Sequence, residues 1–249
     1  MDWFEVLSEN HMVEGGSPLV FLDRLRAQYP IVPHGVSMNL GGDEDPQHTR
    51  MLRRLVDRVN PPWFSDHLCW TGTREFRLHD LVPVPYTVPQ RDHMVDRIVR
   101  MQNDFGRLFA VENVSAYLCY RDSVLAEWDF LTELAEKADC GLLLDVNNIY
   151  VSSINLGFDP IAFLDGLPLH RVVQVHLAGH SVYDGYRLDT HDHPVCDEVW
   201  VLYREVIRRL GSVSTLIEWD GNIPSFERLQ EEAETARRHR DAALAGRAA

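Results

Sequence analysis

The feature that most constrains the fold is a regular alternation of short apolar runs with amphipathic segments. Seven runs are rich in β-branched and aromatic residues and almost continuously apolar, as parallel strands are when both faces are covered. They span residues 2–10, 31–39, 63–70, 108–113, 141–148, 171–180 and 214–220. Alternation of this kind predicts right-handed strand–helix–strand crossovers and a parallel sheet.

The intervening segments carry helix signals. Ser17 and Pro18, for example, place an N-cap and a first-turn proline at the start of residues 17–30. No glycine-rich phosphate loop follows any strand, which argues against a nucleotide-binding open sheet. A length of 249 residues suits one TIM barrel. We therefore predict a TIM (β/α) barrel over residues 1–224 that lacks its first strand–helix unit, and a C-terminal helix with a frayed tail over residues 225–249.

Charge and cysteine content indicate which partners and which cellular compartment the protein has. The chain has 24 basic and 38 acidic residues and a formal net charge of -14, which disfavours nucleic acid. No apolar run approaches the ~20 residues that span a bilayer, and the first residues lack a secretion-signal pattern. The four cysteines lack CxxC spacing, which favours reduced thiols. We expect a cytoplasmic protein that binds neither nucleic acid nor membrane.

Polar residues stand where the apolar runs end, and the C-terminal strand ends of a (β/α) barrel carry its catalytic groups. Each residue alone has an ordinary explanation, such as a helix cap or a structural histidine. Several negative charges at one mouth, however, are costly unless cations neutralise them. The strand-end residues are Glu9, Asn10, His34, His67, Glu112, Asn113, Asp145, Asn147, His176 and Glu218, with Asp189 and His191 in the loop after the sixth run.

This mixture of imidazoles and carboxylates suits first-row divalent ions such as iron, manganese or zinc. The absence of clustered cysteines argues against a structural zinc site. The ligands suffice for two or three ions, and Glu112, in the middle of the strand order, is the expected bridging carboxylate. We predict Glu112, Asp145 and His176 as the catalytic residues.

Eight segments in order resemble one family: FEVLSEN, PHGVSMNLG, SDHLCW, HDLVPVPYT, LLLDVNNIYVSSINLGFDP, QVHLAGH, DTHDHPV and LIEWDGNIP. This is the family of multinuclear non-heme iron-dependent oxidative enzymes that includes the methanobactin biosynthesis oxidase. The resemblance runs from about Asp2 to Pro224. It implies a TIM barrel with two or three irons of mixed Fe(II)/Fe(III) valence and O2 as co-substrate. It also implies oxidation of cysteine in a ribosomally made precursor peptide, beside a partner protein that recognises the peptide leader.

The resemblance also implies roles for single residues. His34, His67 and Glu112 would hold one iron, and Glu112, Asp145, His176 and Glu218 a second. Asp189 and His191 would hold a third with an asparagine, for which period-two alternation along a strand favours Asn147 over Asn148. The family's glycine-containing first strand and following helix are absent before FEVLSEN. Residues expected around the ligands or facing the substrate are Glu9, Asn10, Asn113, Asn148, His180 and His193.

Two other classes fit parts of this pattern. One is a different divalent-metal TIM-barrel enzyme, such as a sugar isomerase or an abasic-site endonuclease, which would need no oxygen. The other is a barrel that serves only as a scaffold, which need not retain iron.

Overall fold

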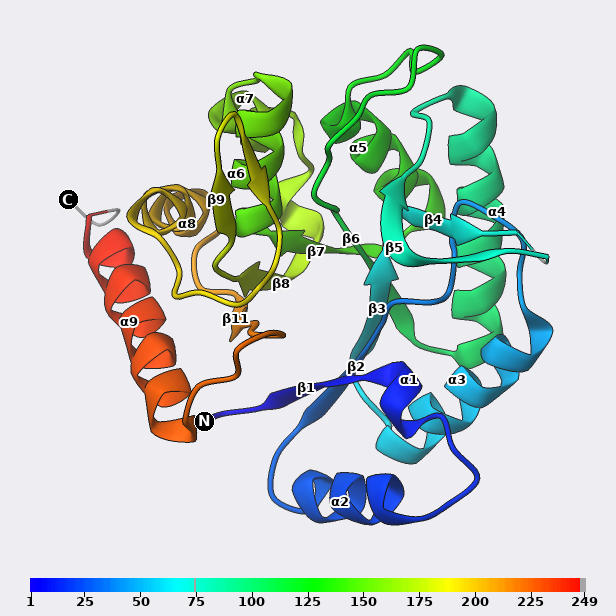
Figure 1. The fold of residues 1–249 in the computed structure, drawn as a ribbon. Helices are drawn as coiled ribbons and strands as arrows, with labels where there is room; N and C mark the ends of the chain where they lie inside the picture. Colours follow the sequence, from blue (N-terminus) through cyan, green and yellow to red (C-terminus); the bar gives the residue numbers. More distant parts are fainter. Residues whose placement is uncertain (74, 247–249) are drawn as a thin grey trace.

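The computed structural model describes residues 1–73 and 75–246. Among them, seven strands form one parallel sheet in the order β1-β2-β3-β6-β7-β8-β11, which curls into a nearly closed barrel with helices outside it (Figure 1). This confirms the predicted TIM-type fold with seven strands. The strands are β1 (Phe4–Leu7), β2 (Ile31–Gly35), β3 (Trp63–His67), β6 (Leu108–Glu112), β7 (Gly141–Asp145), β8 (Val172–Leu177) and β11 (Ser214–Ile217).

Helices follow most strands, as the amphipathic segments predict. In α3, Asp45 caps the first turn by accepting from the Gln47 backbone N–H at 2.9 Å, and Asn60 ends the helix in the left-handed conformation. The helices are α1 (Ser8–His11), α2 (Ser17–Arg26), α3 (Pro46–Val59), α4 (Val88–Phe105), α5 (Glu127–Ala138), α6 (Val146–Leu156), α7 (Pro160–Gly166), the 3-10 turn η1 (Leu169–Arg171), α8 (Asp197–Leu210) and α9 (Phe226–Ala245).

Some boundaries differ from those expected. The first strand ends at Leu7, opposite His34, because pairing with β2 stops there and the polar residues that follow form α1. Residues 146–148, expected at the end of a strand, are the first turn of α6, because Asp145 caps that helix by accepting from the Asn148 backbone N–H at 2.6 Å.

Two hairpins that the alternation did not predict lie on the C-terminal side of the barrel. The first pairs β4 (Cys69–Gly72) with β5 (Arg77–Pro83), directly after β3. The second pairs β9 (Ser181–Tyr183) with β10 (Tyr186–Leu188), shortly after β8. Both therefore extend the barrel beyond the strand ends and border its mouth (Figure 1).

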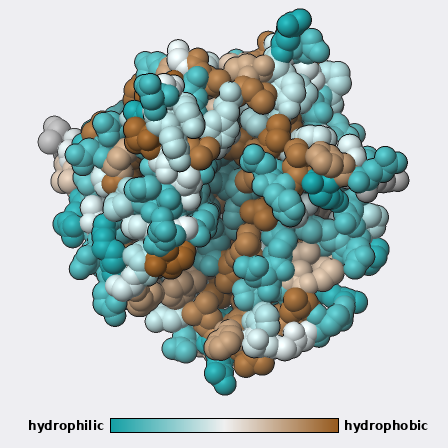
Figure 2. All heavy atoms as spheres, viewed as in Figure 1, coloured by the Kyte–Doolittle hydropathy of each residue, from teal (hydrophilic) through white to brown (hydrophobic). Residues whose placement is uncertain are grey.

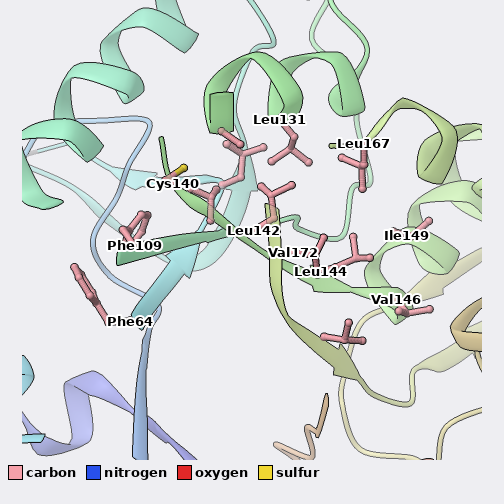
Figure 3. Packing of buried hydrophobic residues seen from close by; sticks show 14 of the residues in the cluster. Phe64, Phe109, Leu131, Cys140, Leu142, Leu144, Val146, Ile149, Leu167 and Val172 are labelled. Atoms are coloured by element: carbon pink, nitrogen blue, oxygen red, sulfur yellow. The ribbon is translucent and has the colours of Figure 1, made fainter. Parts of the chain in front are cut away.

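The main hydrophobic core lies between the sheet and the helices. Figure 3 shows Phe64 and Phe109 from β3 and β6 beside Leu142 of β7, with Leu131 of α5 above them. The two phenylalanine rings are 5.2 Å apart in an edge-to-face arrangement. Because strand residues alternate between faces, these apolar side chains leave their neighbours in sequence to point into the barrel.

The barrel has one seam, between β1 and β11, the two strands at the ends of the sheet. No pairing joins them within residues 1–73 and 75–246. A groove of about 1000 Å³ runs along the seam, is lined by both strands and by α9, and reaches His34 and Glu218 inside. No helix in the described part of the chain is long and apolar enough to cross a membrane.

Candidate metal centre

The strand register brings the predicted residues together at the mouth of the barrel. His67 at the end of β3 stands beside Glu112 at the end of β6, and Asp145 of β7 stands beside His176 of β8. Parallel strands end at one face, so these side chains converge there. All four are buried, which is unusual for charged groups without a compensating partner.

Two groups of potential ligands share Glu112. In the first, the Nε2 atoms of His34 and His67 each lie 3.3 Å from Glu112 Oε2. In the second, His176 Nδ1 lies 3.3 Å from Glu112 Oε1 and 3.0 Å from Glu218 Oε2, and Asp145 completes the set. One ligand atom from each residue of a group lies within 4.8 Å of the others.

The atoms that face this centre have no hydrogen-bond partner among the described residues, although they are buried. They are His34 Nε2, both carboxylate oxygens of Glu112, Asp145 Oδ2 and His176 Nδ1. Buried polar atoms left unpaired cost free energy, so a cluster of them points to a missing partner. Metal–ligand bonds of about 2.1 Å place neighbouring ligand atoms roughly 3 Å apart, as found here. The residues present thus fit a metal ion.

The Nδ1 atoms of His34 and His67, on the far side of each ring from Glu112, have polar partners that orient the two rings. His67 Nδ1 lies 3.0 Å from the Gly35 carbonyl oxygen, which can only accept, so Nδ1 carries a proton and Nε2, which faces Glu112, is the nitrogen left for an ion. His34 Nδ1 lies 2.9 Å from the Ser65 hydroxyl. Asp66 accepts from the backbone N–H groups of Met38 and His67 and holds the loop after β2 against β3.

Burial and charge crowding shift the pKa values of several groups of the centre. Burial alone would lower the pKa of His67, but the negative charges of Glu112 and Asp66 outweigh it and raise that pKa to about 10. Burial and the nearby carboxylates raise the pKa of Asp145 well above its usual range, although the charge of His191 opposes this. Burial opposes ionisation of Glu218, but His176 and His191 hold its pKa well below the ordinary value. Without cations, the centre therefore retains protons to balance its carboxylates.

A third group surrounds His191 in the loop after β10. His191 Nε2 lies 2.7 Å from Asp189 Oδ1, while Nδ1 lies 3.4 Å from Glu218 Oε2 and 3.2 Å from Asp220 Oδ2. His191, Glu218 and Asp220 together could hold an ion. The backbone of His191 has a φ of 46° and is held by the N–H of Asp220, which donates to the His191 carbonyl at 2.7 Å.

Asn147, rather than Asn148, lies beside this third group. Its Nδ2 donates to Asp189 Oδ1 at 2.8 Å, and its Oδ1 lies 2.8 Å from His180 Nδ1. Asn148 instead donates to the Asn113 carbonyl oxygen at 3.0 Å. Asn147 therefore contacts the third group and Asn148 does not. The strand alternation that favoured Asn147 does not apply, because both residues are in α6 and not in a strand.

Other predicted residues support the mouth or lie outside it. Asn113 bridges β6 to β7, since its side chain both donates to the Asp145 carbonyl and accepts from the Asp145 N–H, each at 2.9 Å. Glu9 is held away from the centre by the Val36 N–H and by His48 Nε2 at 3.1 Å. Asn10 lines the seam groove. His193 is exposed and pairs with Asp192.

Strand-end reasoning missed two groups inside the barrel. Glu5 of β1 and Gln174 of β8 lie one layer below the mouth and contact His176. The sequence contains a feature that could have identified both residues, because each is a polar residue within an apolar strand. Gln174 also precedes His176 by two positions, so the two side chains lie on the same face of the strand. Asp220 was missed because it lies in the loop beyond β11.

Comparison with solved structures defines the fold. A D-tagatose 3-epimerase-like protein matches with a TM-score of 0.63 at 14% identity, over 98% of this chain and 90% of that one. The 3-keto-D-glucoside 4-epimerase of E. coli matches with a TM-score of 0.57 at 15% identity, over 95% and 89%. At such identities the likeness establishes the fold alone, a TIM barrel, here with a candidate metal site at its mouth.

The family follows from the sequence. The chain belongs to the RiPP precursor modification enzymes of the MbnB/TglH/ChrH family, whose model matches residues 1–241. This confirms the resemblance seen in the motifs. A UPF0276 protein of Anaeromyxobacter sp. (strain Fw109-5) is 50% identical over 248 residues, 98% of this chain and 87% of that protein. A UPF0276 protein of Acaryochloris marina (strain MBIC 11017) is 46% identical over 237 residues, 94% of this chain and 85% of that protein.

Proposed function

We propose that this protein is a multinuclear iron-dependent oxidase that uses O2 to modify cysteine residues of a ribosomally made precursor peptide. The observation that carries the proposal is the cluster of buried histidine and carboxylate atoms around Glu112 that make no hydrogen bond with the described residues and lie at the spacing of metal ligands. Family membership supplies the class of reaction, peptide modification. Imidazole and carboxylate ligands without thiolates suit iron in a redox role.

We assign the ligands as the geometry groups them. His34, His67 and Glu112 would hold one iron, and Glu112, Asp145, His176 and Glu218 a second, with Glu112 as the bridge. When bound, the irons would supply the electron-transfer chemistry that protein side chains lack. The protein's own part is to hold these groups in place and to limit the access of bulk water to them, since all of these ligands except Glu218 are buried.

For a third iron we propose Asp189, His191 and Asn147. The Asn147 carboxamide would be flipped by rotation about its terminal bond, so that its oxygen faces the ion and its NH2 group donates to His180 Nδ1. Burial and the positive charge of Arg187 lower the pKa of His180, so its ring is neutral near pH 7 and can accept. Asp220 is an alternative ligand from the other side of His191.

The rim of the mouth suits a peptide substrate. Exposed apolar side chains lie on the elements that follow β3, β6 and β8. Figure 2 shows that the surface of the molecule is hollowed at its centre. Aromatic and apolar side chains at such a rim would pack against the side chains of a bound peptide. The side chains are Phe76 before β5, Tyr117 and Leu118 after β6, and Val182, Tyr183 and Tyr186 of the β9–β10 hairpin. A partner that presents the peptide leader could share this rim.

The test is oxidation of a cysteine-containing candidate precursor peptide, chosen from the short reading frames that neighbour this gene. Protein purified without oxygen and loaded with Fe(II) is mixed with the peptide, and O2 consumption and peptide mass are followed. We expect O2 uptake and a mass change with the native peptide, and neither with a Cys→Ser peptide. A modification that proceeds equally without O2 or with the Cys→Ser peptide would contradict the proposal and favour another metal-dependent TIM-barrel activity. Absence of bound iron would favour a scaffold.

A further inference from the structure

One layer below the candidate ligands, the barrel interior holds a buried carboxylate that no strand-end argument explains. Glu5 of β1 points inward, and its side chain is 8% exposed. Its carboxylate oxygens lie 3.1 and 3.2 Å from His176 Nε2. The opposite ring nitrogen, Nδ1, faces Glu112 and Glu218. Glu5 is therefore on the far side of the ring and is not itself placed to be a ligand.

The two sides of the His176 ring have different requirements. To bind an ion, Nδ1 must present a lone pair, so the single proton of the neutral ring must be on Nε2. An Nε2–H group buried at this depth needs an acceptor. Among the described residues that contact Nε2, Glu5 offers oxygen acceptors at 3.1 and 3.2 Å. Gln174 presents its NH2 group at 2.8 Å, which can only donate, so this contact must lengthen when Nε2 carries the proton.

Two further side chains hold Glu5 in place. Trp63 Nε1 donates to Gln174 Oε1 at 2.8 Å, and because an indole can only donate, this bond fixes the orientation of the carboxamide. The Gln174 NH2 group then points to Glu5 and donates to Oε2 at 2.5 Å. Residues from β1, β3 and β8 thus converge across the barrel interior and anchor the Glu5 carboxylate beneath His176.

We infer that Glu5 is a positioning residue: it accepts the Nε2 proton of His176 and so directs the Nδ1 lone pair of that ring to the metal ion. Gln174 and Trp63 orient Glu5. Carboxylates that bind the second nitrogen of a ligating histidine orient the ring and raise its basicity. The inference rests on the metal centre proposed above but not on the peptide or on O2.

The experiment is a titration of the metal-free protein with Co(II), whose visible absorption reports the ligand geometry. Glu5→Gln is compared with wild type and with Glu14→Gln, a matched change at an exposed glutamate that pairs with Arg54 on the surface. Removal of such a partner weakens metal binding by about 10- to 100-fold. We expect that loss, and an altered visible spectrum, for at least one Co(II) in Glu5→Gln, with wild-type values in Glu14→Gln. Circular dichroism verifies folding.

Wild-type Co(II) affinity and spectrum in folded Glu5→Gln would overturn the inference and leave the proposed function intact. If Glu5→Gln does not fold, Trp63→Phe decides, because it keeps the carboxylate and removes the bond that orients Gln174. A weakened site with a changed spectrum supports the inference, and an unchanged one overturns it. Failure of the wild-type protein to bind any Co(II) would instead contradict the proposed function.

Discussion

At the scale of single residues, the site depends on which atoms of each side chain are already occupied. The two carboxylate oxygens of Asp145 have different roles. Oδ1 caps α6 by accepting from the Asn148 N–H, and Oδ2 faces the centre and makes no hydrogen bond within the described part of the chain. The two ring nitrogens of His67 also have different roles: Nδ1 donates to the Gly35 carbonyl oxygen, and Nε2 faces Glu112. Each such anchor leaves one atom directed to the centre, so little reorganisation is needed when an ion binds.

Loss of either anchored ligand should remove metal. His67→Ala and Asp145→Ala are each expected to weaken iron binding by about 100-fold or more, beyond the effect of losing a supporting hydrogen bond. His170→Ala and Asp104→Ala, changes at exposed positions, serve as matched controls. Elemental analysis after anaerobic gel filtration gives the iron content. Wild-type iron in both site variants would exclude this ligand assignment.

Metal binding should release protons. With a pKa of about 10 in the metal-free protein, His67 is protonated at pH 7, and an ion must displace that proton to bind Nε2. Affinity for the metal is therefore expected to rise with pH between about 7 and 10. Titration with Zn(II) in weak buffer with a pH indicator measures the release, which should be smaller in His67→Ala. Equal release from both proteins would show that the ion does not displace a proton from His67.

At the scale of elements, register explains why so much of the site could be predicted. Parallel strands end together, so each polar residue that closes an apolar run reaches the same mouth, as His67 and Glu112 do. Glu5 and Gln174 could not be placed this way, because their partner is defined by packing across the barrel and not by position along a strand. The β9–β10 hairpin was missed because each of its strands is only three residues long.

One buried carboxyl outside the site makes stability depend on pH. Glu127, the first residue of α5, lies beside Tyr86, and burial raises its pKa to about 7 from 4.5. Between pH 4.5 and 7 the unfolded chain ionises this group while the folded protein keeps it protonated, so stability falls as pH rises. The free energy of unfolding should drop by about 3 kcal/mol through this group alone.

Urea unfolding of the metal-free protein at pH 5 and pH 8 checks this. Glu127→Gln should lose less stability than wild type over this interval, whereas Glu136→Gln, at an exposed position of the same helix, should lose as much as wild type. The same pH dependence in wild type and Glu127→Gln would show that Glu127 ionises normally in the folded protein.

At the scale of the whole molecule, the seam distinguishes one side of the barrel from the other. β7 is paired on both edges and entirely buried, whereas β1 and β11 each have one paired edge and line the groove. The length of the chain and its seven apolar runs predicted this strand number. The groove itself could not be predicted, because its size depends on how far the sheet curls.

Hydrogen exchange should reveal the seam. Backbone amides of β6 and β7 are expected to exchange only upon global unfolding, while those of β1 and β11 that face the groove should exchange through smaller openings. Mass spectrometry of peptides from the exchanging protein measures both. Equal protection of all four strands would indicate that the seam is closed in solution.

The central claim is that the strand ends hold a multinuclear iron centre bridged by Glu112. Anomalous diffraction on both sides of the iron absorption edge, from crystals of protein purified without oxygen, tests it most directly. We predict separate iron peaks between His34, His67 and Glu112 and between Glu112, Asp145, His176 and Glu218. A peak at neither place in protein that has retained its iron would contradict the account.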